Sequence, residues 1–203
     1  MIAVIDYKAG NLTSVVKALH YLGAREVVVT QSPDVVLAAE KVVLPGVGHF
    51  QATHLLGELA LTEAVRASIA QGAWFLGICV GLQWLFEGST EAPATPGLGA
   101  LAGMCERFPA VVDGAELKSP HVGWNSLELL RHDSRLLRGV GDGGFVYFTH
   151  SWRAPVVDAT AAVTNYGGAF TAAVERDNVM GVQFHPEKSA EVGLRVLQNF
   201  LEL

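Results

Sequence analysis

A single cysteine stands in the stretch FLGICVGLQ, residues 75–83, between an apolar run typical of a strand and a pattern typical of a helix. If a strand ends and a helix begins there, Cys79 lies where a helix N-terminus presents unpaired N–H groups. Those groups and the helix dipole favour a thiolate, the reactive form of cysteine. Gly77 and Gly81 permit a sharp turn and a close approach of neighbouring chain. We expect a nucleophile here, with a small buried apolar residue as the alternative.

A nucleophilic thiol needs a base, and the best candidate among the seven histidines is His185. It follows the apolar run VMGVQF, so it also lies at the end of a predicted strand. In an extended backbone the period of two places His185 and Glu187 on the same side, with Pro186 fixing the backbone between them. A carboxylate there accepts one ring N–H and leaves the other nitrogen to take the thiol proton. The residues indicate a Cys79–His185–Glu187 triad; a polar turn in which Glu187 and Ser189 start the last helix is the alternative.

The stretch LPGVGHF, residues 44–50, ends another apolar run with two glycines around Val47. Such a turn can present backbone N–H groups to an anion. The N–H groups of Val47 and of Val80, the residue after the cysteine, could together hold the oxyanion formed in acyl transfer. An ordinary strand-to-helix turn is the alternative for residues 44–50.

The other residue types that can do chemistry fit ordinary roles. Cys105 lies in an alternating strand pattern and is expected in the core. The sequence has no Walker loop and no dinucleotide fingerprint, and its Cys and His spacings give no zinc site. We therefore expect no cofactor and no metal. Surface or packing roles are expected for four further histidines: His20, His49, His54 and His132.

The elements that must position these residues change character near residue 98. Before it, β-branched runs alternate with helical patterns, which indicates a parallel sheet covered by helices on both faces. After it, extended segments with Gly, Asp and Asn turns predict antiparallel hairpins, followed by a last strand at 179–184 and a helix at 190–203. We predict one α/β domain over residues 1–203 with a mixed, largely parallel sheet and an antiparallel excursion in its second half. The first-half strands are expected at 1–7, 26–30, 41–46 and 74–78, and helices at 11–23, 61–72 and from residue 80 onwards.

Composition narrows the classes of partner. Half of the 203 residues are hydrophobic and 17% are charged, which is typical of a compact folded chain. The net charge of −6, without a run of Lys or Arg, argues against nucleic acid as a partner. No apolar stretch approaches the ~20 residues of a membrane helix, and the first residues have no basic segment. We expect no membrane association, reduced cysteines and a cytoplasmic location.

The combination of GICVGLQ and FHPE resembles the class I glutamine amidotransferases, and the resemblance extends along nearly the whole chain. It implies an open, flavodoxin-like sheet and assigns nucleophile, base and carboxylate to Cys79, His185 and Glu187. The stretches IDYKAGNL, LPGVGHF, PHVGWN, FTHSW and QFHPEKS together are similar to the glutaminase subunits of imidazole glycerol phosphate synthase. PHVGWN is the most specific of them, and Lys8 departs from the small residue expected in the first.

This resemblance implies hydrolysis of glutamine to glutamate and ammonia. The ammonia would pass to a separate βα-barrel cyclase subunit, in a heterodimer, which makes imidazole glycerol phosphate and the aminoimidazole carboxamide ribonucleotide in histidine biosynthesis. Residues near the subunit interface and the ammonia route would be Asn11, Trp124 and Lys188, although Trp124 could equally be a buried aromatic. Glutamine contacts are implied for Gly48, Gln83, Glu91, His150 and Ser151. Glu91 would bind the α-ammonium group, with a solvated loop carboxylate as its alternative.

Two rival functions remain open from the sequence. The glutaminase subunit of another synthase, such as the one that makes pyridoxal phosphate, would share the nucleophile and HPE motifs but should lack PHVGWN. A non-catalytic module of the same fold could use Cys79 as a redox sensor. A carboxylate-backed histidine argues against the second, because sensing requires a thiolate but no glutamine site.

Overall fold

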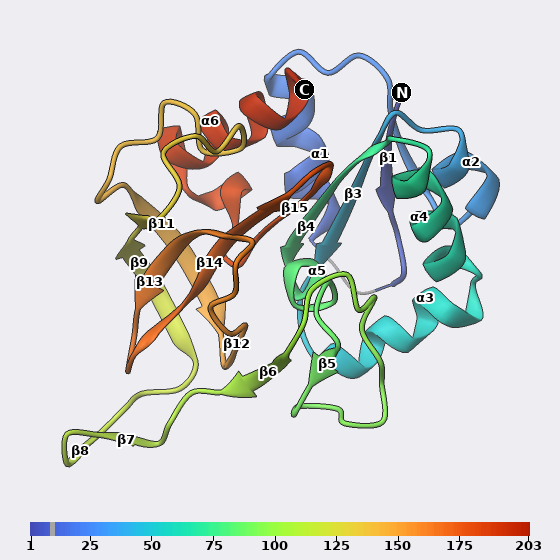
Figure 1. The fold of residues 1–203 in the computed structure, drawn as a ribbon. Coiled ribbons are helices and arrows are strands. Elements are labelled where there is room, and N and C mark those ends of the chain that lie inside the picture. Colours follow the sequence, from blue (N-terminus) through green and yellow to red (C-terminus); the bar gives the residue numbers. More distant parts are fainter. Residues whose placement is uncertain (9–10) are drawn as a thin grey trace.

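The computed structural model describes residues 1–8 and 11–203, and its main feature is an eight-stranded sheet through the middle of the molecule (Figure 1). The strand order is β10-β13-β14-β15-β4-β3-β1-β2. The part from β15 to β2 is parallel and has the order of a flavodoxin-like sheet, which confirms the predicted fold class. These parallel strands are β1 (Ile2–Ile5), β2 (Val27–Thr30), β3 (Lys41–Gly46), β4 (Trp74–Cys79) and β15 (Val179–Val182).

The antiparallel excursion is partly continuous with this sheet. Three strands extend it beyond β15 in antiparallel order: β14 (Ala169–Arg176), β13 (Thr160–Asn165) and β10 (Glu128–Leu129). A separate antiparallel pair lies beside them, formed by β9 (His121–Ser126) and β11 (Phe145–His150). The remaining strands are short, and the hairpin of β7 and β8 projects from the body (Figure 1). They are β5 (Gly88–Ser89), β6 (Met104–Arg107), β7 (Val111–Val112), β8 (Ala115–Glu116) and β12 (Trp152–Arg153).

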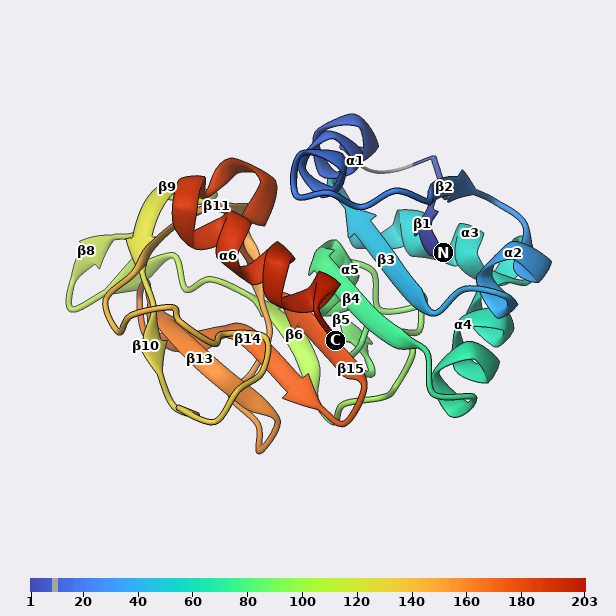
Figure 2. The same ribbon diagram turned by 90° about the horizontal axis from the view of Figure 1, so that it is seen from above.

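Helices cover both faces of the sheet, as predicted. Helices α1 (Leu12–Tyr21) and α6 (Ala190–Leu201) lie together on one face, and α2 (Pro33–Leu37), α3 (His54–Glu58) and α4 (Leu61–Ala70) lie on the other (Figures 1 and 2). Each long helix buries residues three or four apart, such as Val15 and Leu19 in α1, so its apolar stripe packs on the sheet. Strands β1 and β15 are buried along their whole length because helices cover both sides. Within the described chain, no helix is long and apolar enough to cross a membrane.

The helix predicted from residue 80 onwards is wrong in its length. Only α5 (Val80–Gln83) forms, a single buried turn. The N–H groups of Leu98 and Gly99 donate to the carbonyls of Trp84 and Phe86, so a returning loop uses the acceptors that a longer helix would need. This loop, residues 88–99, is partly buried for the same reason.

Candidate active site

Cys79 ends β4 and forms the tight turn into α5, as the sequence predicts. Its φ of 56° and ψ of −107° lie in a region that residues other than glycine rarely adopt, which is typical of a nucleophile exposed at a strand-to-helix turn. A Cβ on Gly77 would lie 2.3 Å from the carbonyl oxygen of Gly81, and a Cβ on Gly81 would lie 2.0 Å from that of Leu44. The two glycines are therefore required by the close packing of α5 on β3 and β4.

His185 and Glu187 meet directly after β15. The distance from His185 Nδ1 to Glu187 Oε1 is 2.9 Å, and the side chains are only 2% and 1% exposed. The predicted pairing is confirmed, but the predicted extended backbone is wrong, because residues 186–188 form the 3-10 turn η2 (Pro186–Lys188). This turn, with Pro186 at its first position, places Glu187 beside the ring.

The segment that carries His185 is anchored to strand β11. The His185 N–H donates to the carbonyl of Tyr147 at 2.9 Å. Ser189 Oγ donates to the His185 carbonyl at 2.6 Å and accepts the Tyr147 N–H at 2.9 Å. Ser189 precedes α6 but makes no side-chain cap bond to it, so its hydroxyl positions the histidine segment rather than the helix.

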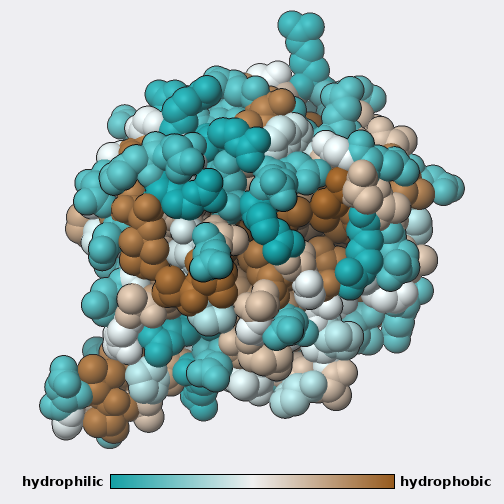
Figure 3. Space-filling view, viewed as in Figure 1, coloured by the Kyte–Doolittle hydropathy of each residue, from teal (hydrophilic) through white to brown (hydrophobic). Residues whose placement is uncertain are grey.

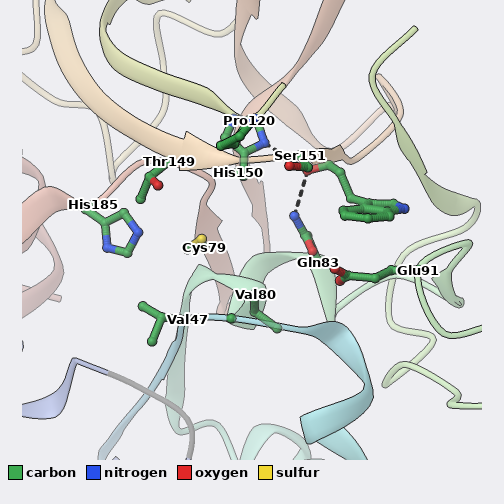
Figure 4. A pocket seen from close by; sticks show the side chains of 12 residues that line it. Val47, Cys79, Val80, Gln83, Glu91, Pro120, Thr149, His150, Ser151 and His185 are labelled. Atoms are coloured by element: carbon green, nitrogen blue, oxygen red, sulfur yellow. Dashed lines mark hydrogen bonds between the residues drawn. The ribbon is translucent and has the colours of Figure 1, made fainter. Parts of the chain in front are cut away.

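The ring of His185 is held in its protonated form. Burial disfavours the charged ring, but the Cys79 sulfur and the Glu187 carboxylate outweigh burial and raise the pKa of His185 to about 10. Among the described residues, no hydrogen-bond partner contacts Nε2, the nitrogen not bonded to Glu187. The ring faces the pocket and lies beside Cys79, so the sulfur is close enough to affect the pKa of the ring (Figure 4). The arrangement offers one N–H for proton transfer in that pocket.

Gln183 is a site residue that the sequence reasoning missed. Its Nε2 donates to the Cys79 sulfur at 3.6 Å, and its Oε1 accepts from Gln83 Nε2 at 3.0 Å. Gln183 is fully buried. The available signal was a polar residue inside an otherwise apolar strand run, two positions before His185, because a buried amide must find partners.

One pocket of about 260 Å³ brings the predicted residues together (Figure 4). It opens at the carboxyl ends of β3 and β4 and beside β11, where ligands collect in open α/β sheets. His185 and Gln83 lie on opposite sides of the Cys79 sulfur in Figure 4. Glu187 lies outside the lining, because its carboxylate contacts the ring of His185. The predicted residues that line the pocket are Val47, Gly48, Cys79, Val80, Gln83, Glu91, His150, Ser151 and His185, and the unpredicted ones are Pro120, Thr149 and Trp152.

Glu91 is not a solvated loop carboxylate, since its side chain is only 10% exposed. Its Oε2 accepts the Phe50 N–H at 2.8 Å, and its Oε1 lies 3.9 Å from His49 Nε2. These contacts tie the loop of residues 88–99 to the turn after β3. Gly48 in that turn has a φ of +92°, a conformation that favours glycine.

The residues expected at a partner interface lie apart from the pocket lining. Trp124 is 52% exposed, so the alternative of a buried aromatic is wrong. Its ring packs edge-on against Tyr147, and Lys188 Nζ lies 5.9 Å from the centre of the Tyr147 ring. Figure 3 shows apolar side chains on the side where Figure 1 places β9 and β11, and again on the β7–β8 hairpin. Asn11 stands at the N-cap position of α1 without a side-chain cap bond, and the preceding residues 9 and 10 of the IDYKAGNL motif lie outside the described residues.

Cys105 has the core role that its pattern predicts. It is fully buried, burial raises its pKa, and its S–H donates to the Gln83 carbonyl at 3.8 Å. In the part of the chain that the structure describes, no three His, Cys, Asp or Glu side chains gather in the manner of a metal site.

Comparisons with known proteins show the family and the fold of the chain. The family model "Glutamine amidotransferase class-I" matches residues 3–203. The chain is 46% identical over 204 residues to "Imidazole glycerol phosphate synthase subunit HisH" of Methanothermobacter thermautotrophicus, covering 100% of this chain and 98% of that protein. It is 47% identical over 209 residues to the subunit of the same name in Dechloromonas aromatica, covering 99% and 95%. A solved structure, "Crystal structure of glutamine amidotransferase", shares the fold with a TM-score of 0.75 at 21% identity, over 100% of this chain and 98% of that one.

Proposed function

The chain belongs to the class-I glutamine amidotransferases and, within them, to the HisH subunits of imidazole glycerol phosphate synthase, and from this premise we propose how its pocket hydrolyses glutamine. Family membership gives it glutamine amidotransferase function in histidine biosynthesis. The observation that carries the mechanism is Cys79 at a strained turn beside a protonated ring that a buried carboxylate orients. We assign Cys79 as nucleophile, His185 as acid and base, and Glu187 as the residue that orients the ring.

In the first half-reaction the Cys79 thiolate attacks the carbon of the glutamine side-chain carboxamide. A C–S bond forms, and the carbonyl electrons move to the oxygen. When this intermediate collapses, the C–N bond breaks and the Nε2 proton of His185 passes to the departing nitrogen, which leaves as ammonia. The raised pKa of His185 supports this step, because the proton is on the ring before the substrate arrives. The product on the protein is a thioester.

In the second half-reaction water cleaves the thioester. The ring of His185, now neutral, takes a proton from the attacking water, and the C–S bond breaks to return the thiolate and release glutamate. Glu187 bonds Nδ1 throughout, which keeps Nε2 directed at the reacting atoms. The ring is charged again at the end of the cycle.

The oxyanion of both half-reactions is proposed to bind the N–H groups of Val47 and Val80. Both residues line the pocket with Cys79. Val80 is the first residue of α5, so its N–H has no partner within the helix. Such donors act on charge that develops in the transition state and contribute several kcal/mol in comparable enzymes.

Glutamine is proposed to contact Gly48, Gln83, Glu91, His150 and Ser151, which line the pocket. Glu91 would hold the α-ammonium group through Oε1, because Oε2 already accepts the Phe50 N–H. His150 would contribute its main chain, since both of its ring nitrogens bond within the protein.

The partner is proposed to be the βα-barrel cyclase subunit, which receives the ammonia in a heterodimer. The outward side of the β9–β11 pair supports this, because Val122, Trp124 and Phe145 are each more than half exposed there. Large exposed apolar groups that gather on one face are typical of an interaction surface. Lys188 is exposed beside Tyr147 at the edge of this face, and Asn11 is the further residue assigned to the interface.

We propose that residues 1–203 act as one glutaminase domain. The buried apolar residues of the described chain form one continuous cluster that includes both the parallel strands and the antiparallel ones, which supports this. The cytoplasmic location stays a prediction.

Glutamate release from glutamine tests this function. It is measured with the purified chain alone and with a cyclase subunit and its ribonucleotide ligand, using Cys79→Ala as the control. Strong stimulation by the cyclase that disappears in Cys79→Ala is the expected result. Turnover that survives the loss of Cys79 would refute the triad, and no turnover with this partner would return Cys79 to a sensing or structural role.

A further inference from the structure

A network of buried and partly buried groups extends from the pocket to β9, and several of its members have no part in the steps above. At its far end, the orientation of the Asn125 amide is fixed from two sides. Oδ1 accepts the Ser126 N–H at 2.8 Å, and Nδ2 donates to the Asn165 carbonyl at 3.1 Å. Nδ2 also lies 3.3 Å from His121 Nε2. Because Nδ2 can only donate, His121 Nε2 must be the acceptor.

The direction of the next bond follows independently from the pocket end. His150 Nδ1 lies 2.8 Å from the Trp152 carbonyl oxygen, which can only accept, so Nδ1 carries the proton. A neutral ring has one N–H, so His150 Nε2 accepts from His121 Nδ1 at 3.3 Å. His121 therefore has the same tautomer from either end of the network, with the proton on Nδ1. Every bond in this part of the network therefore has one direction.

The network continues to the nucleophile. The Trp152 carbonyl that accepts from His150 also accepts from Gln83 Nε2 at 2.8 Å. Gln83 Nε2 donates in addition to Gln183 Oε1, and Gln183 Nε2 donates to the Cys79 sulfur. A chain of hydrogen bonds thus joins the sulfur to Asn125, through residues that are far apart in the sequence.

The surroundings of the two rings leave them little freedom to turn. His121 stacks between Tyr166 and Phe148, with ring centres 4.1 and 4.9 Å away and interplanar angles of 19° and 25°. Phe108 packs against both His121 and His150. Burial lowers the pKa of His121 to about 4 and that of His150 to about 3, so both rings are neutral. Neutral, stacked rings can hold the bond directions described above.

We propose that Asn125 and His121 are positioning residues for glutamine hydrolysis. Through His150 and the Trp152 carbonyl they fix the amides of Gln83 and Gln183, and thereby the Cys79 sulfur and the side of the pocket that receives glutamine. This inference rests on the proposed function. Strand β9 carries Trp124 on its outward side and Asn125 and His121 on its inward side. A shift of this strand at the proposed partner surface therefore moves Asn125 Nδ2, the first donor of the hydrogen-bond chain.

The tautomers are tested first, by a measurement that does not depend on activity. Long-range proton–nitrogen spectra of the uniformly ¹⁵N-labelled chain distinguish the two neutral forms of each histidine. We expect His121 and His150 as Nδ1–H tautomers that do not titrate between pH 6 and 9. A proton on Nε2 of either ring, or titration of either ring in this range, would overturn the proposed network.

The positioning role is tested by His121→Phe, which keeps an aromatic ring in the stack and removes both hydrogen bonds. In the complex with the cyclase we expect kcat for glutamine hydrolysis to fall about tenfold, which is less than the roughly 10²-fold cost of a 1 Å misplacement of reacting groups. The rate at which iodoacetamide alkylates Cys79 should change by severalfold, which a purely structural residue would not cause. The matched control is His132→Phe, the same change at an exposed position, and it should leave both quantities unchanged.

A second variant reverses one bond. In Asn125→Asp a carboxylate replaces the donor, so His121 must carry a proton on Nε2, and its nitrogen signals should show this. We expect a loss of kcat similar to that of His121→Phe. Folded variants with wild-type kcat and wild-type alkylation would overturn the positioning role. If the wild-type complex itself releases no glutamate, the proposed function fails, while the tautomer measurement still decides the network.

Discussion

His185 and the pair His121 and His150 are buried to nearly the same extent, with 2%, 4% and 7% exposed, and both groups adjoin one pocket. Their charge states are nevertheless opposite. The pKa of His185 is raised to about 10, whereas those of His121 and His150 are lowered to about 4 and about 3. Burial alone therefore does not determine whether a histidine of this protein is charged.

The difference comes from the chemistry of the neighbours. Desolvation disfavours the charged ring in both groups, but only His185 has a carboxylate and a sulfur beside it. His121 and His150 have amide, carbonyl and aromatic neighbours, which supply no negative charge. The first group suits proton transfer, and the second suits a fixed arrangement of hydrogen bonds. Three changes test this comparison.

The largest effect is expected from Glu187→Gln, which removes the negative charge from the first group. The amide can present N–H groups to Nδ1 and so favour the wrong tautomer of His185. We expect kcat for glutamine hydrolysis with the cyclase to fall by roughly 10⁴-fold, in line with the same kind of change in other triads. The pKa of His185 should fall as well, which NMR titration would show.

The control for this change is Glu128→Gln on the surface, where kcat should remain at the wild-type value. A Glu187→Gln variant that keeps more than a tenth of the wild-type kcat would contradict the role of the carboxylate. It would also mean that the charge difference does not explain the different roles of His185 and of the pair His121 and His150.

An intermediate effect is expected in the pH dependence of stability. Because folding lowers the pKa of His121 and His150, their contribution to stability is fully present above the ordinary histidine pKa of about 6.5. It is lost as pH falls from there through 4 and then 3, by at most about 1.4 kcal/mol per pH unit for each ring. For His185, whose pKa is raised, the loss should occur on the other side, as pH rises from about 6.5 to about 10.

Urea denaturation of wild-type and variant chains from pH 4 to 9 measures these slopes. His121→Phe should flatten the acid side and leave the alkaline side unchanged, while Glu187→Gln should flatten the alkaline side. His132→Phe serves as the exposed control. Equal acid slopes for wild type and His121→Phe would mean that His121 is not held neutral by the fold.

The smallest effect is expected from Tyr7→Phe, which tests the burial of a hydroxyl that has no neighbouring group to bond. Tyr7 is 1% exposed, and its hydroxyl has no hydrogen-bond partner among the described residues. Burial raises its pKa, and the charge of Cys79 adds to this. Removing a buried hydroxyl that lacks a partner should raise the free energy of unfolding by up to about 1 kcal/mol. Destabilisation of that size in urea would instead show that the hydroxyl makes a bond in solution.

Local patterns predicted most of the fold. The apolar runs at residues 41–46 and 74–78 became β3 and β4, and the helical patterns at 11–23 and 190–203 became α1 and α6. The spacing of apolar residues along each element indicates which of its sides is buried, and this spacing is a property of neighbouring residues in the chain. The failures lie where distant segments compete for the same backbone groups, as in the helix that stops after Gln83.

The candidate site divides in the same way. The pairing of His185 with Glu187 was predictable because the two residues are neighbours in the chain. The partial burial of Glu91 and the exposure of Trp124 were not, because each depends on segments tens of residues away. Gln183 went unnoticed because its partners, Cys79 and Gln83, lie about a hundred positions earlier.

The sequence by itself determined the order of the elements, the turn at Cys79 and the residues assigned to the triad. Only the tertiary structure decided which buried histidines are charged, how Asn125 is joined to the nucleophile, and which aromatic groups remain exposed. The physical reason is the separation along the chain of the residues on which each property depends. Helix and strand periodicity and tight turns depend on neighbouring residues, whereas desolvation and hydrogen-bond direction depend on which atoms the folded chain brings within about 3 Å of one another.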